Sequence, residues 1–281
     1  MRSEVVGASG VRLGVRVDGE LDAPAIVFVH GWAQSARAWD LQFADPRLRE
    51  RFRLLALDLR GHGVSETPEE DYDDPTVWAD DLAAVLEVAG PDAVVVGWSY
   101  GGLVITDYLR VHGTRGLAGI VFAGAITEIG KGRPGGRVGS AMSAALPDAL
   151  SGDLDVALPA LRTLATGMAA GPVPGHVSQA LLGASLAVPP RVRKALFRRD
   201  VDSADVLAAV DVPTLVLHGT EDAVVDVSAG EYTAGKIAGA ATRWWEGVGH
   251  LPFVESSHEF GTTLRWFAEQ AVDGAVGRAE R

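Results

Sequence analysis

The sequence predicts an α/β protein with a doubly wound, mostly parallel sheet. Short and almost fully apolar runs alternate along the chain with longer segments of helical periodicity. Such runs suit strands that helices cover on both faces, and the alternation favours right-handed strand–helix–strand units. The chain has 281 residues, of which 47% are hydrophobic. That is enough for a sizeable core in one large domain or two small ones.

Seven segments are the expected strands. Residues 11–17 alternate apolar and polar side chains, which is typical of an edge strand. Residues 242–245 are the candidate for the last strand. The buried strands of the sheet are expected at residues 25–29, 53–57, 93–98, 119–123 and 214–217.

Two helices have clear boundaries in the sequence. Asp74-Pro75 supplies an N-cap and a first-turn proline, and Gly90-Pro91 stops the helix that they begin. A second helix is expected over residues 100–112 and ends at Gly113. The apolar side chains of the first helix recur at helical spacing: Trp78, Leu82, Val85, Leu86 and Ala89.

The stretch from residue 126 to residue 212 breaks this alternation. It contains no convincing strand, and clusters of Gly and Pro separate short segments rich in Ala and Leu. We expect a helical cap at residues 126–212, inserted into a core domain made of residues 1–125 and 213–281, because long insertions in compact domains usually carry function. Long connecting helices without a separate cap are the alternative.

A candidate nucleophile lies where an expected strand meets an expected helix. Residues 97–102 read GWSYGG, which is the G-x-S-x-G pattern in strand–turn–helix context. The turn is so tight that the residues flanking the serine must be small, and it lifts the hydroxyl above the carboxyl edge of the sheet. The pattern is common in loops, and its context is what predicts a catalytic Ser99.

A serine hydroxyl needs a base to take its proton, and the chain has seven histidines that compete for this role. His250 follows the last expected strand, and the chain order Ser, Asp, His requires a base in that place. His258 also follows, but its surroundings predict the start of the C-terminal helix and a surface position. We therefore expect His250 to be the base.

The base needs a carboxylate that orients it. Asp222 lies five residues beyond the strand at 214–217, in a loop at the expected catalytic edge. Glu221 and Asp226 are the local competitors, and capping of the following helix is the alternative role for either aspartate. We expect Asp222 to be the third member of the triad.

An oxyanion hole is expected from two backbone N–H groups. The N–H of Tyr100 begins the helix after the nucleophile. The N–H of Trp32 lies in the loop after the strand at 25–29. His30, in the same loop, is expected to structure the loop rather than to act as a second base.

Five motifs occur in the order found in the α/β-hydrolase superfamily, which the chain resembles over nearly its whole length except the insertion. The resemblance implies an eight-stranded, mostly parallel sheet, a lid after the sixth strand, and a triad of Ser99, His250 and Asp222. The motifs are His30-Gly31-Trp32, residues 58–65, residues 97–102, Gly219-x-x-Asp222 and Gly249-His250.

Within the superfamily, residues 30–32 and 97–104 together with Trp39 resemble carboxylesterases that act on pimeloyl carrier-protein methyl esters. They also resemble cofactor-free haloperoxidases, or perhydrolases. Ala33 stands where perhydrolases usually have Pro, and Tyr100 stands where Met or Leu is frequent, so the subfamily stays open. Serine in place of aspartate at the nucleophile position separates the chain from the haloalkane dehalogenases and epoxide hydrolases of this fold.

The sequence therefore predicts a serine hydrolase that cleaves small carboxylic esters through an acyl-enzyme, with no cofactor and no metal. The carboxylesterase branch is favoured. Three alternatives share the triad: perhydrolysis, lactone or carbon–carbon bond hydrolysis, and a ligand receptor with vestigial hydrolysis.

Charge and composition narrow the class of partner. The formal net charge of −12 argues against nucleic acid, whose phosphates such a surface repels. The absence of Cys rules out disulfides and thiolate metal sites. The acidic run at 66–74 is expected to be a solvated loop rather than a calcium site.

Without a signal-peptide pattern or a stretch of ~20 apolar residues, we expect a soluble, cytoplasmic protein.

One basic segment stands out in this acidic chain. Five of the nine residues from Arg191 to Arg199 are basic, and Arg191, Lys194 and Arg198 fall on one helical stripe. Our hypothesis is that the cap presents this patch to an acidic partner, such as a carrier protein, or to an anionic substrate. The alternative is a solvated helix face that pairs with nearby carboxylates at Asp200, Asp202 and Asp205.

Overall fold

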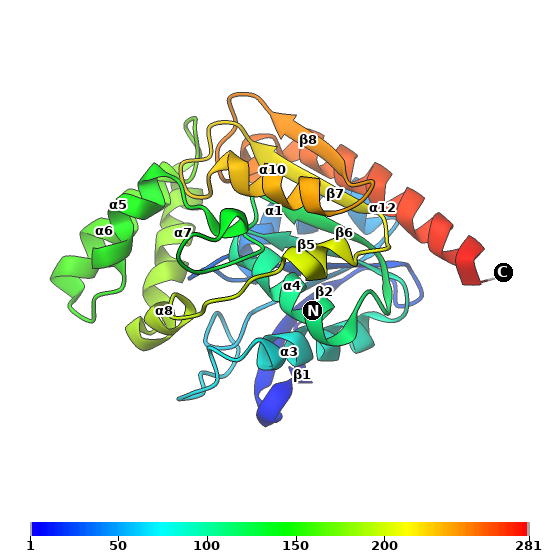
Figure 1. The fold of residues 1–281 in the computed structure, drawn as a ribbon, viewed down its shortest axis with the longest axis horizontal. Helices are drawn as coiled ribbons and strands as arrows, with labels where there is room; N and C mark the ends of the chain where they lie inside the picture. The colour runs from blue at the N-terminus through cyan, green and yellow to red at the C-terminus, as the bar shows by residue number, and fades with distance from the viewer. Residues whose placement is uncertain (1, 280–281) are drawn as a thin grey trace.

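An eight-stranded sheet in the order β1-β2-β4-β3-β5-β6-β7-β8 forms the centre of the computed structural model, which describes residues 2–279 (Figure 1). β1 pairs antiparallel with β2 and β2 with β4, whereas every other neighbouring pair is parallel. This confirms the predicted mostly parallel α/β sheet. The strands are β1 (Arg2–Val6), β2 (Arg12–Asp18), β3 (Ala25–Val29), β4 (Arg53–Leu57), β5 (Ala93–Trp98), β6 (Leu117–Ala123), β7 (Thr214–Gly219) and β8 (Ala241–Trp245).

The strand order reverses at β3 and β5. The chain runs from β3 outward to β4 and then crosses back to β5 on the other side of β3. Every residue of β3, β5 and β6 is buried, as continuous apolar runs require. In sheets of this kind ligands bind beyond the carboxyl ends of the strands at such a switch point. A binding site is therefore expected at the loops after β3 and β5.

Helices cover both faces of the sheet (Figure 1). α3 (Pro75–Ala89) and α4 (Tyr100–His112) pack against each other and against β3. α12 (Ser257–Ala279) packs against β5 and β6. Three short helices pack against α12: α1 (Asp40–Ala44), α2 (Pro46–Arg49) and α11 (Pro252–Glu255). α10 (Val227–Lys236) packs against β7.

The two predicted helices have the predicted ends. The carboxylate of Asp74 accepts a hydrogen bond from the N–H of Thr76 at 2.8 Å, and so caps α3. α3 ends before Gly90 (φ +93°), and α4 ends before Gly113 (φ +63°). Positive φ angles of this kind explain why glycine occupies both positions.

The expected edge strand is not at the edge. β2 matches the run predicted at 11–17 within one residue, but β1 pairs along its outer side. β1 was missed because it has little apolar signal: Val5 is buried, whereas the neighbouring Val6 is 66% exposed. A strand with one short buried face gives too few alternations to recognise.

The segment between β6 and β7 is helical, and no strand runs through it in the described chain. Only isolated bridges occur, between Ile129 and Val201 and between Val138 and Val225. α5 to α8 gather beyond one end of the sheet (Figure 1), whereas α9 packs against α4 and α10. The helices are α5 (Ser140–Ala149), α6 (Leu154–Gly167), α7 (Gly175–Ala187), α8 (Pro190–Leu196) and α9 (Ala204–Ala208).

None of the helices within residues 2–279 combines the length and apolar character that crossing a membrane would require.

Candidate active site

Ser99 occupies a strained turn between β5 and α4. Its backbone has φ +55° and ψ −122°, which a residue with a Cβ rarely adopts. The flanking glycines are sterically required: a Cβ on Gly101 would lie 2.4 Å from the carbonyl oxygen of Val29, and one on Gly97 would lie 2.6 Å from Ile105 Cδ1. The structure therefore has the strand–turn–helix geometry that the GWSYGG motif predicted.

His250 and Asp222 form a buried pair in the loops that follow β8 and β7. His250 Nδ1 lies 2.7 Å from Asp222 Oδ2, and both side chains are almost fully buried. The other oxygen, Oδ1, accepts the N–H groups of Val224 at 2.8 Å and Val225 at 2.9 Å. Burial opposes ionisation of this carboxyl, but the attraction of His250 and hydrogen bonds from His218 and His250 outweigh it, so the pKa of Asp222 lies below its usual range.

This pair lies against the carboxyl ends of β5 and β6. The indole of Trp98 donates a hydrogen bond to the carbonyl oxygen of His250 at 2.9 Å. Gly124, which follows β6, has φ +50°, and a Cβ there would lie 3.2 Å from Asp222 Oδ2 and 3.3 Å from His250 Nδ1. The loops after β5, β6, β7 and β8 thus converge at the carboxyl edge of the sheet.

The loop after β3 passes directly against the nucleophile turn. A Cβ on Gly31 would lie 2.8 Å from the Cβ of Ser99 and 3.3 Å from its Oγ. Trp32 is the next residue, and its indole donates to the carbonyl oxygen of Arg193 at 3.1 Å. The backbone of Trp32 is therefore held between the core and the helical segment, and Tyr100 begins α4 immediately after Ser99.

His30 structures this loop, as expected. Its Nε2 accepts a hydrogen bond from the N–H of Leu59 at 3.0 Å, and its Nδ1 donates to the carbonyl oxygen of Gly31 at 2.8 Å. Burial lowers the pKa of His30 to about 4, so it remains neutral at ordinary pH.

The competitors of His250 and Asp222 have other positions. His258 lies in the first turn of α12 and contacts Arg47 on an exposed surface. Asp226 caps α10, where its carboxylate accepts the N–H of Ser228 at 3.0 Å. Helix capping, the alternative considered for either aspartate, is therefore the role of Asp226.

Two of the five basic side chains in this segment are internal, whereas the other three are exposed. Arg193 is buried and donates to backbone carbonyl oxygens, including Val188 at 2.9 Å. Arg199 is buried against Asp107. Asp200 and Asp202, the expected partners of the segment, pair instead with Arg133. The three residues of the predicted stripe, Arg191, Lys194 and Arg198, are exposed.

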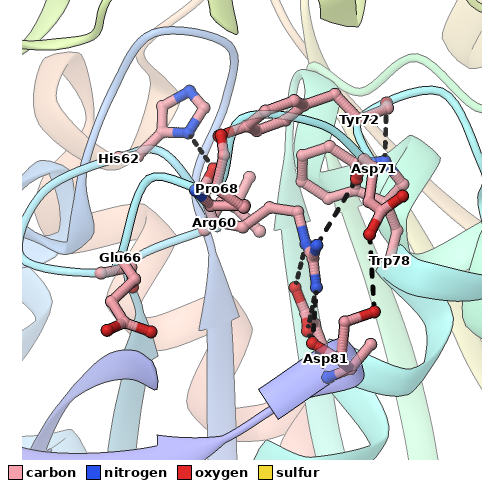
Figure 2. Close-up of polar contacts among 12 residues, drawn as sticks. Arg60, His62, Glu66, Pro68, Asp71, Tyr72, Trp78 and Asp81 are labelled. Carbon is pink, nitrogen blue, oxygen red and sulfur yellow. Dashed lines mark hydrogen bonds and ion pairs between the residues drawn. The ribbon is translucent and has the colours of Figure 1, made fainter. Parts of the chain in front are cut away.

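The acidic side chains of the loop at 66–74 are mostly exposed to solvent, as expected, while hydrogen bonds hold its backbone in place (Figure 2). Arg60 pairs with Asp81 through two contacts of 2.7 and 2.8 Å and also donates to the carbonyl oxygen of Asp71. The indole of Trp78 donates to the carbonyl oxygen of Tyr72 at 3.0 Å.

In the part of the chain that the structure describes, no three His, Asp or Glu side chains gather as a metal site would need.

A second carboxylate, for which the sequence predicted no role, organises the site. Glu255 of α11 accepts the N–H groups of Gly249 and Leu251, each at 3.1 Å, and so holds the backbone on both sides of His250. It also accepts the N–H of Ala170 at 2.8 Å. The available signal was its spacing of five residues from His250.

A mostly parallel sheet with a serine elbow after β5 and a buried Asp–His pair after β7 and β8 defines an α/β hydrolase. Residues 26–262 match the model of the alpha/beta hydrolase family, and the chain belongs to that family. Its fold is similar to the crystal structure of an esterase from Rhodococcus sp. ECU1013, with a TM-score of 0.91 and 46% identity. That match covers 95% of this chain and 98% of the other.

Two curated relatives represent the expected subfamilies. A bifunctional esterase/perhydrolase of Acinetobacter calcoaceticus is 32% identical over 241 residues, which cover 79% of this chain and 82% of that protein. A pimeloyl-[acyl-carrier protein] methyl ester esterase of Hamiltonella defensa is 26% identical over 262 residues, which cover 90% of this chain and 95% of that protein. The resemblance to both groups is thereby confirmed.

Proposed function

We propose that Ser99, His250 and Asp222 form the catalytic triad of this enzyme and act on carboxylic esters through an acyl-enzyme. The chain is a hydrolase of ester bonds, as are the solved esterase and the curated relatives. The observation that carries the residue assignment is the buried 2.7 Å contact between His250 and Asp222, at the sheet edge where the strained turn presents Ser99.

In the proposed mechanism, Ser99 Oγ attacks the ester carbonyl carbon while His250 Nε2 takes its proton. Asp222 accepts the Nδ1–H of His250 and stabilises the imidazolium that forms. The N–H groups of Trp32 and Tyr100 donate to the oxyanion of the tetrahedral intermediate. His250 then protonates the departing alcohol, and it later activates the water that releases the carboxylic acid.

A covalent probe tests the nucleophile directly. A fluorophosphonate reacts with an activated serine, so wild-type protein should gain one adduct, and peptide mapping by mass spectrometry should locate it on Ser99. The His250→Ala variant should label far more slowly, because the base is missing. An adduct on another serine would contradict the proposal.

We also propose that residues 126–212 cap the site, over a core of residues 1–125 and 213–281. Three contacts support this division: Trp32 donates to the carbonyl oxygen of Arg193, Gln34 donates to that of Leu181, and the N–H of His250 donates to that of Met168. Each joins a loop at the catalytic edge to the helical segment. The helical segment is therefore expected to shape the substrate pocket.

Perhydrolysis is a second candidate activity, which the bifunctional relative favours. Hydrogen peroxide would replace water in the second half-reaction and attack the same acyl-enzyme. Adding peroxide to an acetate-ester assay should then produce peracetic acid. A rate of peracid formation equal to that of the Ser99→Ala variant would contradict it.

A narrower proposal concerns the form of the substrate. The exposed stripe of Arg191, Lys194 and Arg198 supports an acyl group delivered on an acidic carrier protein, as in the pimeloyl esterases. Reversing Lys194 and Arg198 to Glu should raise KM for a carrier-bound or anionic ester and leave KM for a small neutral ester unchanged. Equal effects on both substrates would contradict it.

A cytoplasmic location remains a prediction, supported by the absence of Cys.

A further inference from the structure

A second buried imidazole contacts Asp222. His218 is the penultimate residue of β7, and its side chain is fully buried. Its Nε2 lies 3.2 Å from Asp222 Oδ2 and 3.0 Å from the carbonyl oxygen of Val225. The oxygen that His218 approaches is the same one that His250 contacts at 2.7 Å.

The protonation state of His218 follows from these partners. The carbonyl oxygen of Val225 can only accept a hydrogen bond, so Nε2 must carry the proton. Nδ1 is buried and has no hydrogen-bond partner among the described residues. It faces α10, where a Cβ on Gly230 would lie 2.5 Å away. A proton on Nδ1 would be a buried and unpaired N–H, which is costly, so the tautomer with Nε2–H is favoured.

From this geometry we propose that His218 is a positioning residue for Asp222, an inference that rests on the triad proposed above. Val225 gives its N–H to Asp222 Oδ1 and accepts the Nε2–H of His218 at its carbonyl oxygen, while His218 Nε2 also lies 3.2 Å from Asp222 Oδ2. The three residues form a closed ring of two hydrogen bonds and one close polar contact. The ring fixes the carboxylate plane so that Oδ2 points at His250.

The same contact tunes the strength of the base. An N–H close to Oδ2 withdraws negative charge from the oxygen that stabilises the imidazolium of His250 during the reaction. Asp226 is a second carboxylate near His218, and it accepts a hydrogen bond from Ser228 at the start of α10. The hydrogen bond from Ser228 and the nearby charge of Arg137 lower the pKa of Asp226. The shared Oδ2 therefore remains the direct link between the two imidazoles.

The test compares two replacements of similar size but different donor capacity. His218→Phe removes the N–H, whereas the amide of His218→Gln extends far enough to replace Nε2–H. For hydrolysis of p-nitrophenyl acetate between about pH 5 and about pH 9, His218→Phe should move the acidic limb of kcat/KM to higher pH by roughly half a unit or more. Its plateau kcat should fall about tenfold with KM nearly unchanged. His218→Gln should restore both.

Two controls keep the outcome decisive. If His218→Phe does not fold, His218→Asn replaces it, because its amide is too short to reach Asp222 and should shift the limb as well. An acidic limb at the wild-type pH in both the Phe (or Asn) and Gln variants would overturn the proposal and leave His218 as packing. Ser99→Ala is assayed in parallel: if it keeps hydrolysing the ester, the triad itself fails, whereas an inactive Ser99→Ala with unshifted His218 variants refutes only the role of His218.

Discussion

The guanidinium of Arg199 donates to both carboxylate oxygens of Asp107, each at 2.7 Å, and both side chains are fully buried. A further N–H of Arg199 donates to the hydroxyl of Tyr100 at 3.0 Å. Asp107 and Tyr100 belong to α4, the helix that begins at the nucleophile turn, while Arg199 follows α8 of the helical segment. This ion pair therefore joins the helical segment between β6 and β7 to the helix that supplies a proposed oxyanion donor.

Breaking this pair should destabilise the protein strongly. Asp107→Asn leaves the Arg199 charge buried without a carboxylate, and we expect it to lower the free energy of unfolding in urea by about 3–5 kcal/mol. The matched control is Arg133→Gln, which breaks exposed pairs with Asp200 and Asp202 and should change stability little. Equal losses in the two variants would contradict the structural role of Arg199.

Stability should fall as the pH drops below neutrality, because two buried histidines resist protonation. Burial lowers the pKa of His30 to about 4 and that of His62 to about 3. In the unfolded chain both titrate near ~6.5, so below that pH the unfolded state binds protons that the folded state does not. Each unit of pH below ~6.5 should cost up to about 1.4 kcal/mol per histidine until the folded-state pKa is reached.

Urea unfolding followed from about pH 7 to about pH 5 measures this loss. The control is His62→Asn, whose amide can still donate to the carbonyl oxygen of Arg60, the partner of His62 Nδ1. This variant should lose less stability over the same range. A free energy of unfolding that is flat between the two pH values would contradict a net loss of stability from the buried histidines.

Adding a side chain to the nucleophile turn by substitution should slow catalysis. In Gly101→Ala the new Cβ would lie 2.4 Å from the carbonyl oxygen of Val29, so the turn must move. We expect kcat for ester hydrolysis to fall about 100-fold, which is the size of effect that a displacement of about 1 Å produces. The control is Gly183→Ala in α7, where the space is open and stability should rise by about 0.5–1 kcal/mol. A fully active Gly101→Ala enzyme would contradict the packing argument.

The parallel sheet was readable from the sequence because its strands are nearly uninterrupted apolar runs. The predicted bounds at 25–29, 53–57 and 93–98 coincide with β3, β4 and β5. Strands buried on both faces leave no polar positions to obscure their ends. β1 lacks this property, since it lies at the edge and buries few side chains, and it was missed.

The site was predictable where chain order determines chemistry. The pairing of His250 with Asp222 follows from their places after the last two strands. The role of Arg199 does not, because its carboxylate partner lies 92 residues earlier in the chain, while its neighbours Asp200 and Asp202 pair elsewhere. Reasoning from adjacent residues fails for charges that the fold buries across long separations.

Hydrolysis of p-nitrophenyl esters from acetate to dodecanoate shows whether Ser99 is the nucleophile of an esterase. Wild-type protein should turn over at least part of this series. Ser99→Ala should lose at least about 10⁴-fold in kcat on every ester while unfolding at the same urea concentration as the wild type. Ester hydrolysis that survives undiminished in Ser99→Ala, or an inactive wild type across the whole series, would contradict the account.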